Sequence, residues 1–231
     1  MRKKKRRRPM VTILTVLLVV CAVTGIALAS LSSVTNEETN VFTPSDNIRA
    51  SLSEPNWNAQ EGLKLVPGKT VSKDPMITNT GQVSEYAAIR LTFQYQDGET
   101  AMSGADLLRL LNLIELSWSD KWVLCGGTMV IDGTGEVTSV TQPLIFYYTE
   151  SLPSGAVSDP VFSSIRVKDK SDGLTEADLR WLQAIKIEDG EIIDDPAGLG
   201  QFHILVEGAA VQTQSYPDAA GAASTLKGLF P

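Results

Sequence analysis

The stretch YAAIRLTFQYQ, residues 86–96, indicates the fold class because its side chains alternate between two kinds. The odd-numbered positions are apolar or aromatic: Ala87, Ile89, Leu91, Phe93 and Tyr95. The even-numbered positions between them are mostly polar: Ala88, Arg90, Thr92, Gln94 and Gln96. A period of two is typical of an antiparallel strand with one buried and one wet face. We therefore expect a strand with a core face and a solvent face.

The segment just before this strand, PGKTVSKDPMITNTG (residues 67–81), begins and ends with turn residues. Between the turns, residues 71–77 predict a short strand that contains Pro75. Proline cannot donate to a sheet ladder, so such a strand lies at an edge or has a bulge at the proline. We expect the turns to fold this edge back against residues 86–96, with Val71, Pro75 and Ile77 forming an acceptor edge.

Short strand patterns separated by turn signals continue along the chain. Further strands are predicted at residues 48–52, 116–124, 128–131, 136–140, 143–149, 161–167 and 202–213, with hairpin turns at 126–127 and 132–135, a candidate bulge at Gly208, and the run LIFYY in a central position. Three short helices are predicted at 104–115, after a capping box at 175–178, and at 217–229. The pattern favours a mainly β, two-layer antiparallel sandwich over residues 48–231.

The N-terminus carries a targeting pattern. MRKKKRRR holds seven of the 20 basic residues, and the 20 residues after Pro9 are uncharged. Ala27 and Ala29 before Ser30 form a small-residue site for signal peptidase, which predicts that residues 1–29 are a cleaved signal peptide. The alternative is an uncleaved anchor through residues 10–29, because about 20 apolar residues can cross a bilayer.

Cleavage would leave a polar N-terminal arm, residues 30–47, with few apolar side chains: Val34, Val41 and Phe42 are candidates for its contacts. We expect this arm to be flexible. The mature chain would keep 13 basic against 27 acidic residues, a net charge of −14. Such a surface disfavours nucleic acid and anionic lipid as partners, because both are bound by neutralising phosphates.

The residues needed for catalysis are sparse. His203 is the one histidine, HExxH and GxSxG are absent, and a structural imidazole is the expected role of His203. Cys125 would be the one cysteine after cleavage, so no internal disulfide forms, and its apolar neighbours favour a core position over pairing between molecules. No enzyme activity and no zinc cofactor are predicted.

Two acidic segments raise the question of calcium: DKSDGLTEAD (169–178) and EDGEIIDDP (188–196). Ca²⁺ takes six to eight oxygen ligands, and neither segment has EF-hand spacing. Acidic residues in the first turn of a helix, together with solvated loops, explain these carboxylates without a cation. Calcium remains the weaker alternative.

Four stretches of this chain resemble the TasA/camelysin family of exported Gram-positive biofilm-matrix and spore-coat proteins. They are the signal ending in ALAS, the segment PGKTVSKDPMITNTG, the pair WSDKW and LIFYYTESLPSGAVSDPVFSSIRV, and the C-terminal FHILVEGAAVQTQSYPDAAGAASTL. Their order and spacing carry the likeness, which covers most of residues 1–229. Pro153-Ser154-Gly155 departs from the Pro-Gly pair that the family tends to have there.

The resemblance implies a jelly-roll-like sandwich, processing by an ER-like signal peptidase, and fibres in which the arm of one subunit completes the sheet of the next. We expect a secreted structural protein of the matrix or cell surface whose partner is itself. Two alternatives remain open: a cell-surface metallopeptidase of the camelysin kind, for which this chain has no zinc constellation, and a monomeric binding module anchored by residues 10–29.

Overall fold

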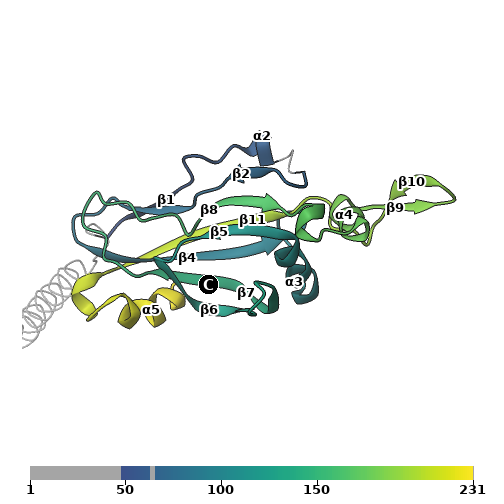
Figure 1. The fold of residues 1–231 in the computed structure, drawn as a ribbon. Helices are drawn as coiled ribbons and strands as arrows, with labels where there is room; N and C mark the ends of the chain where they lie inside the picture. The colour runs from purple at the N-terminus through teal and green to yellow at the C-terminus, as the bar shows by residue number, and fades with distance from the viewer. Residues whose placement is uncertain (1–47, 63–65, 231) are drawn as a thin grey trace, which may run out of the picture. The chain divides into compact units, whose positions relative to one another are not determined.

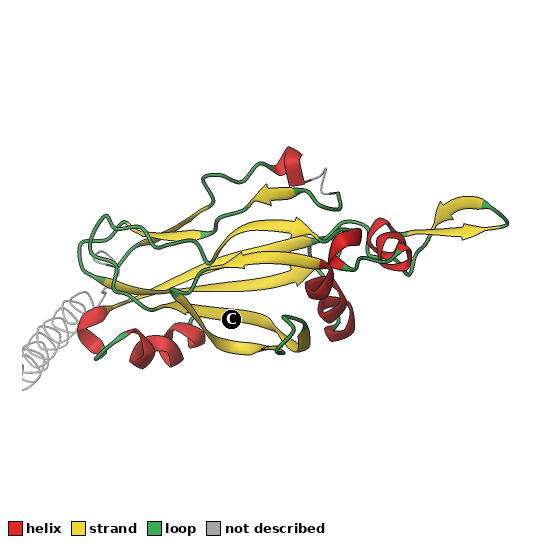
Figure 2. Ribbon diagram, in the orientation of Figure 1, coloured by secondary structure: helices red, strands yellow, loops and turns green. Residues whose placement is uncertain are grey.

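The four longest strands form an antiparallel sheet with the order β11-β4-β7-β6 (Figures 1 and 2). They are β4 (Glu85–Gln94), β6 (Trp122–Ile131), β7 (Val137–Tyr148) and β11 (His203–Gln212). Strand β11 pairs with β4 over ten residues. The run LIFYY lies in β7, between β4 and β6, which confirms its predicted central position.

The computed structural model describes residues 48–62 and 66–230, which lie in one compact unit. The predictions for the signal peptide and arm therefore lie outside the described residues, and with them Ala27, Ala29, Ser30, Val34, Val41 and Phe42.

A second set of strands forms the opposite layer. Strand β8 (Phe162–Val167) lies between β2 (Thr70–Ser72) and β5 (Ile114–Trp118), and β1 (Ala50–Ser53) pairs with β3 (Met76–Asn79). The indole of Trp118 in β5 packs against the rings of Phe146 in β7 (5.2 Å) and Phe162 in β8 (5.5 Å). The contact between Trp118 and Phe146 joins the two layers, so the predicted mainly β sandwich is confirmed.

Three helices of eight or more residues accompany the described strands: α3 (Gly104–Leu113), α4 (Glu176–Gln183) and α5 (Ala219–Gly228). Ser103 caps α3 by accepting from the Asp106 N–H, and Thr175 forms a capping box with Asp178 at α4. A four-residue helix, α2 (Ala59–Gly62), and the 3₁₀ turns η2 (Lys170–Asp172) and η3 (Thr213–Ser215) complete the set. Within the described part of the chain, no helix has the length and apolar composition needed to cross a bilayer.

Strand β4 differs from the prediction of one wet face. Ala88, on the predicted solvent face, is fully buried in a cluster with Ile145, Ala222 and Leu226. The last two side chains come from α5, so the C-terminal helix covers the second face of the sheet (Figure 1). Cys125 packs at the margin of this cluster and is half-buried, so its predicted core position is only partly correct.

Two predicted boundaries are wrong. Residues 116–124 do not form one strand, because β5 and β6 belong to different layers and are separated by a turn at Asp120-Lys121. The pair Gly126-Gly127 is not a turn but lies inside β6, where the register shifts against a continuous β7. A Cβ on Gly127 would lie 2.4 Å from the Pro143 carbonyl oxygen, so glycine permits this close approach of two backbones.

The predicted bulge at Gly208 is also wrong, since β11 keeps its register with β4 through Gly208 and Ile89. The glycine has a packing role instead: a Cβ there would lie 2.6 Å from Cδ1 of Ile77 in β3. Gly208 therefore lets the β1–β3 pair lie close to β11. The DGTG turn at 132–135 is confirmed as the β6–β7 hairpin, with the Asp132 N–H donating to the Glu136 carbonyl oxygen at 2.9 Å.

Candidate functional site

The predicted acceptor edge is divided between two strands. Val71 lies in β2, Ile77 lies in β3, and Pro75 stands between them. The prediction that this edge folds against residues 86–96 is wrong, because β4 pairs with β11 and β7 while β3 pairs with β1. The side chains of Val71 and Ile77 point into the core and are 2 % and 0 % exposed.

The chain itself occupies both edges of β3. On one side β1 pairs with all four β3 residues. On the other side the Asn79 N–H donates to the Ala156 carbonyl oxygen (2.9 Å), and the Ser158 N–H donates to the Ile77 carbonyl oxygen (2.8 Å). The Val161 N–H likewise donates to the Pro75 carbonyl oxygen at 2.9 Å. Of the predicted acceptor strand, only β2 lies at the margin of its sheet among the described residues.

Strand β1 is held by polar contacts with two parts of the chain, residues 73–74 and residues 80–85. We call these contacts the β1 lock. At the start of β1, the Arg49 N–H donates to Glu85 Oε1 at 2.7 Å, and the Arg49 carbonyl oxygen accepts from the Thr80 N–H at 2.8 Å. Beyond β1, Asn56 donates to the Asp74 carboxylate from its N–H (3.0 Å) and its Nδ2 (2.7 Å). The β1 lock therefore holds the chain both before and after the four residues of β1 that pair with β3.

An ion pair completes the β1 lock. Lys73 Nζ lies 2.7 Å from Glu54 Oε1 and 4.7 Å from the centre of the Trp57 ring. The side chains of Lys73 and Glu54 are 8 % and 20 % exposed, so water screens this pair less than a surface pair. Lys73 and Asp74, directly before Pro75, thus hold the chain that follows β1.

The Asn79-Thr80-Gly81 turn supports the other end of the lock. Asn79 is fully buried, and its Nδ2 donates to the carbonyl oxygens of Val83 and Leu152, both at 2.7 Å. Its Oδ1 accepts from the Gly81 N–H at 2.8 Å. These three bonds fix the turn that presents Thr80 to Arg49.

Glu85 is the most unusual charged residue of the described chain. Its side chain is fully buried, and burial raises the pKa of its carboxyl group, an effect that the hydrogen bond from the Arg49 N–H partly opposes. Within the described residues, Oε2 has no hydrogen-bond partner. Because burial disfavours the charged form of this carboxyl group, we expect the attachment of β1 to weaken as pH rises through its raised pKa.

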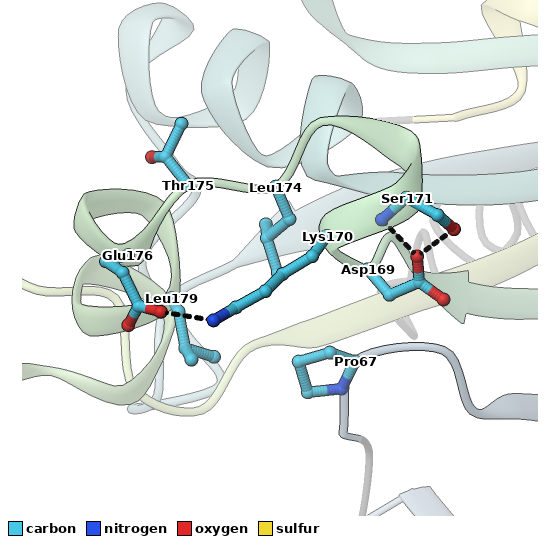
Figure 3. Close-up of a pocket in the computed structure, with 8 residues that line it drawn as sticks. All are labelled: Pro67, Asp169, Lys170, Ser171, Leu174, Thr175, Glu176 and Leu179. Carbon is cyan, nitrogen blue, oxygen red and sulfur yellow. Dashed lines mark hydrogen bonds and ion pairs between the residues drawn. The ribbon is translucent and has the colours of Figure 1, made fainter.

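A hollow of about 370 Å³ lies beside the turn that precedes β2 (Figure 3). Pro67 lines one side, and Leu174 and Leu179 line the other. Leu174 is buried in the main core, and Leu179 packs against it. We call this cavity the Pro67 hollow; its other lining residues are Asp169, Lys170, Ser171, Thr175 and Glu176.

The polar groups around the Pro67 hollow bond to one another. Lys170 Nζ lies 2.6 Å from Glu176 Oε1, and this contact raises the pKa of Lys170. Asp169 Oδ1 accepts from the Ser171 N–H at 2.8 Å, and bonds from Ser171 lower the pKa of Asp169. The hollow therefore combines an apolar lining with a polar rim whose groups are paired.

The candidates for catalysis do not assemble into a site. His203 is exposed at the start of β11, which differs from the predicted structural role. Cys125 lies in β6, and burial raises the pKa of its thiol, which disfavours the nucleophilic thiolate. Residues 48–62 and 66–230 contain no group of three or more His, Cys, Asp or Glu side chains that could hold a metal ion.

The acidic segments take structural roles. Arg166 pairs with Asp172 at 2.6 Å and with Asp169 at 3.2 Å, and Asp169 caps η2. The second segment forms the hairpin of β9 (Ile185–Glu188) and β10 (Glu191–Asp194), which extends beyond α4 (Figure 1). The sequence patterns did not predict this hairpin, although Asp189-Gly190 is a recognised turn signal.

No family model, curated protein or solved structure matches this chain.

Proposed function

We propose that this chain is a secreted structural protein of the extracellular matrix or cell surface that assembles into fibres. The N-terminal arm, residues 30–47, of one subunit adds to the sheet of the next. The export pattern of residues 1–29 and the resemblance of four stretches to the TasA/camelysin family support this proposal.

One structural observation supports the proposal most directly: β2 is an outer strand of its sheet. An outer strand has backbone groups that can pair with another chain, and strand addition uses them for affinity while alternate side chains set the register. Because β1 and residues 156–158 occupy both edges of β3, the proposed acceptor is β2 around Val71 rather than the whole stretch from Val71 to Ile77.

Deletion of residues 30–43 tests this proposal. The mature protein, residues 30–231, is expected to form fibres visible by electron microscopy, and the deletion variant is expected to remain as single particles. Unchanged fibres from the deletion variant would refute arm addition. Mass spectrometry of the native N-terminus then distinguishes a chain that starts at Ser30 from one still anchored by residues 10–29.

Zinc analysis and casein digestion address the peptidase alternative. The proposed structural role predicts no chelator-sensitive cleavage by the purified mature chain. Stoichiometric zinc together with such cleavage would favour the enzyme.

A further inference from the structure

The β9–β10 hairpin is a separate two-stranded sheet that extends beyond α4 (Figures 1 and 2). Among the described residues, these two strands form ladder pairs with each other and with no third strand. All four residues of β10 are exposed. A hairpin of two strands is marginally stable in water and is stabilised when a third strand or another element packs against it. The outer edge of β10 is therefore open to a further strand.

One face of this hairpin is apolar. Ile187 and Ile192 are directly opposite each other, and the alternation of the strand places Ile185 on the same face, opposite Asp194. The side chains of Ile187 and Ile192 are 53 % and 70 % exposed. Single apolar residues on a surface are common, but a group of them on one face of a sheet indicates a contact surface.

The opposite face carries most of the charge; its residues are Lys186, Glu188, Glu191 and Ile193. Glu188 and Glu191 are directly opposite each other, and like charges in this arrangement destabilise a strand pair. Lys186 Nζ lies 2.5 Å from Glu188 Oε1, whereas Glu191 has no ion-pair partner within residues 48–62 and 66–230. A positive charge beside Glu191 would therefore relieve a repulsion that the hairpin leaves uncompensated.

Charge also decides what kind of molecule fits this surface. Residues 185–195 hold five acidic residues and one basic residue, a net charge of −4. A second copy of the chain would bring the same charges to the contact, and an anionic membrane would likewise be repelled. A basic partner is attracted by the same charges.

We propose that the β9–β10 hairpin binds an extended segment of a partner protein in which apolar and basic residues alternate, and that this segment pairs with β10 as a third strand. Successive side chains of a strand point to opposite faces, so the apolar residues cover Ile187 and Ile192 while Lys or Arg residues meet Glu188 and Glu191. The inference does not depend on fibre formation, because it uses neither residues 30–47 nor β2.

A short synthetic peptide in which valine and lysine alternate tests the inference. It is titrated onto the mature chain, residues 30–231, and followed by fluorescence anisotropy. We expect saturable binding, together with slower hydrogen exchange at the amides of β10 as a new ladder forms. The absence of binding, or binding without this protection, would overturn the inference.

A second peptide separates strand addition from simple charge attraction. It has the same composition, with all valines in one block and all lysines in another, so it cannot place its lysines on one face of a strand. We expect it to bind about tenfold more weakly. Equal binding of the two peptides would overturn the inference.

Matched variants of the protein locate the site. Ile192→Thr keeps a β-branched residue and is expected to weaken binding about tenfold, whereas Leu205→Thr, at an exposed leucine of β11, is expected to change it less than about twofold. Glu191→Gln is expected to weaken binding and reduce its dependence on salt, and Glu136→Gln in the β6–β7 hairpin is the control. Circular dichroism checks that each variant keeps its fold. Equal effects within either pair would overturn the inference.

Two other results would assign the isoleucine face to a different occupant and so overturn the inference. Loss of self-association of the mature chain in Ile192→Thr, without peptide binding in the parent, would identify a second copy. Binding of phosphatidylcholine vesicles that Ile192→Thr abolishes, again without peptide binding, would identify a membrane.

Discussion

Strands β4 and β1 are both antiparallel, but different forces hold them. Strand β4 pairs on both edges and is buried on both faces, by the opposite layer and by α5. Strand β1 pairs on one edge, three of its four residues are exposed, and Leu52 is its one half-buried side chain. Apolar burial therefore holds β4, whereas the polar groups of the β1 lock hold β1.

This difference divides the sandwich into a stable part and a part that can open locally. Opening costs less free energy where few apolar contacts are lost, so exchange of backbone amides is expected to be faster in β1 than in β4. The strand that follows directly after the proposed assembly arm is thus the less firmly attached one. Three substitutions test the comparison.

The largest effect is expected from the centre of the stable part. Phe93 in β4 is fully buried, and Phe93→Ala would leave a cavity between the layers. We expect the free energy of unfolding to fall by about 3–5 kcal/mol, measured by urea denaturation. A loss below about 1 kcal/mol would show that apolar burial in β4 does not dominate stability.

An intermediate effect is expected from the β1 lock. Lys73→Met would remove the partner of Glu54 and leave that carboxylate mostly buried. We expect a loss of about 2 kcal/mol, less than for a fully buried pair because Glu54 keeps some exposure. Hydrogen exchange should quicken at β1 amides and stay unchanged in β4.

The pair Lys186–Glu188 provides the control for this ion pair, because its side chains are 40 % and 58 % exposed. Lys186→Met is expected to change stability by less than about 0.5 kcal/mol. Equal losses from Lys186→Met and Lys73→Met would mean that the lock contributes no more than a surface contact.

Among the three test substitutions, the smallest effect, and one that depends on pH, is expected at Glu85. Its folded-state pKa is raised by burial, so its contribution to stability is fully present below the usual glutamate pKa and is lost as pH rises through the raised value. Glu85→Gln cannot ionise. We expect its stability relative to the parent chain to increase from about pH 4 to neutral pH, followed by thermal unfolding. A constant difference across this range would contradict a buried carboxyl group with a raised pKa.

The sequence allowed prediction of the elements whose signals are local. The alternation of residues 86–96, the capping residues Ser103 and Thr175, and the apolar run in β7 each correspond to an observed element. These signals depend on residues a few positions apart, so they can be seen without knowledge of the tertiary structure.

Pairing partners and the β1 lock could not be predicted in the same way. Glycine is typical of turns and bulges, and the sequence therefore suggested these features at Gly127 and Gly208. The structure instead requires glycine at these positions because Pro143 and Ile77, distant in sequence, lie too close for a Cβ atom. The lock joins residues 18 to 36 positions apart. The one local signal of the β1 lock in the sequence was the charged pair Lys73-Asp74 directly before Pro75.

We propose that one mature chain adds to the next. Sedimentation velocity of residues 30–231 over a hundredfold range of concentration measures this assembly in solution. We expect species that lengthen with concentration, and a monomer at every concentration when residues 30–43 are removed. A single monomeric boundary at every concentration would contradict it.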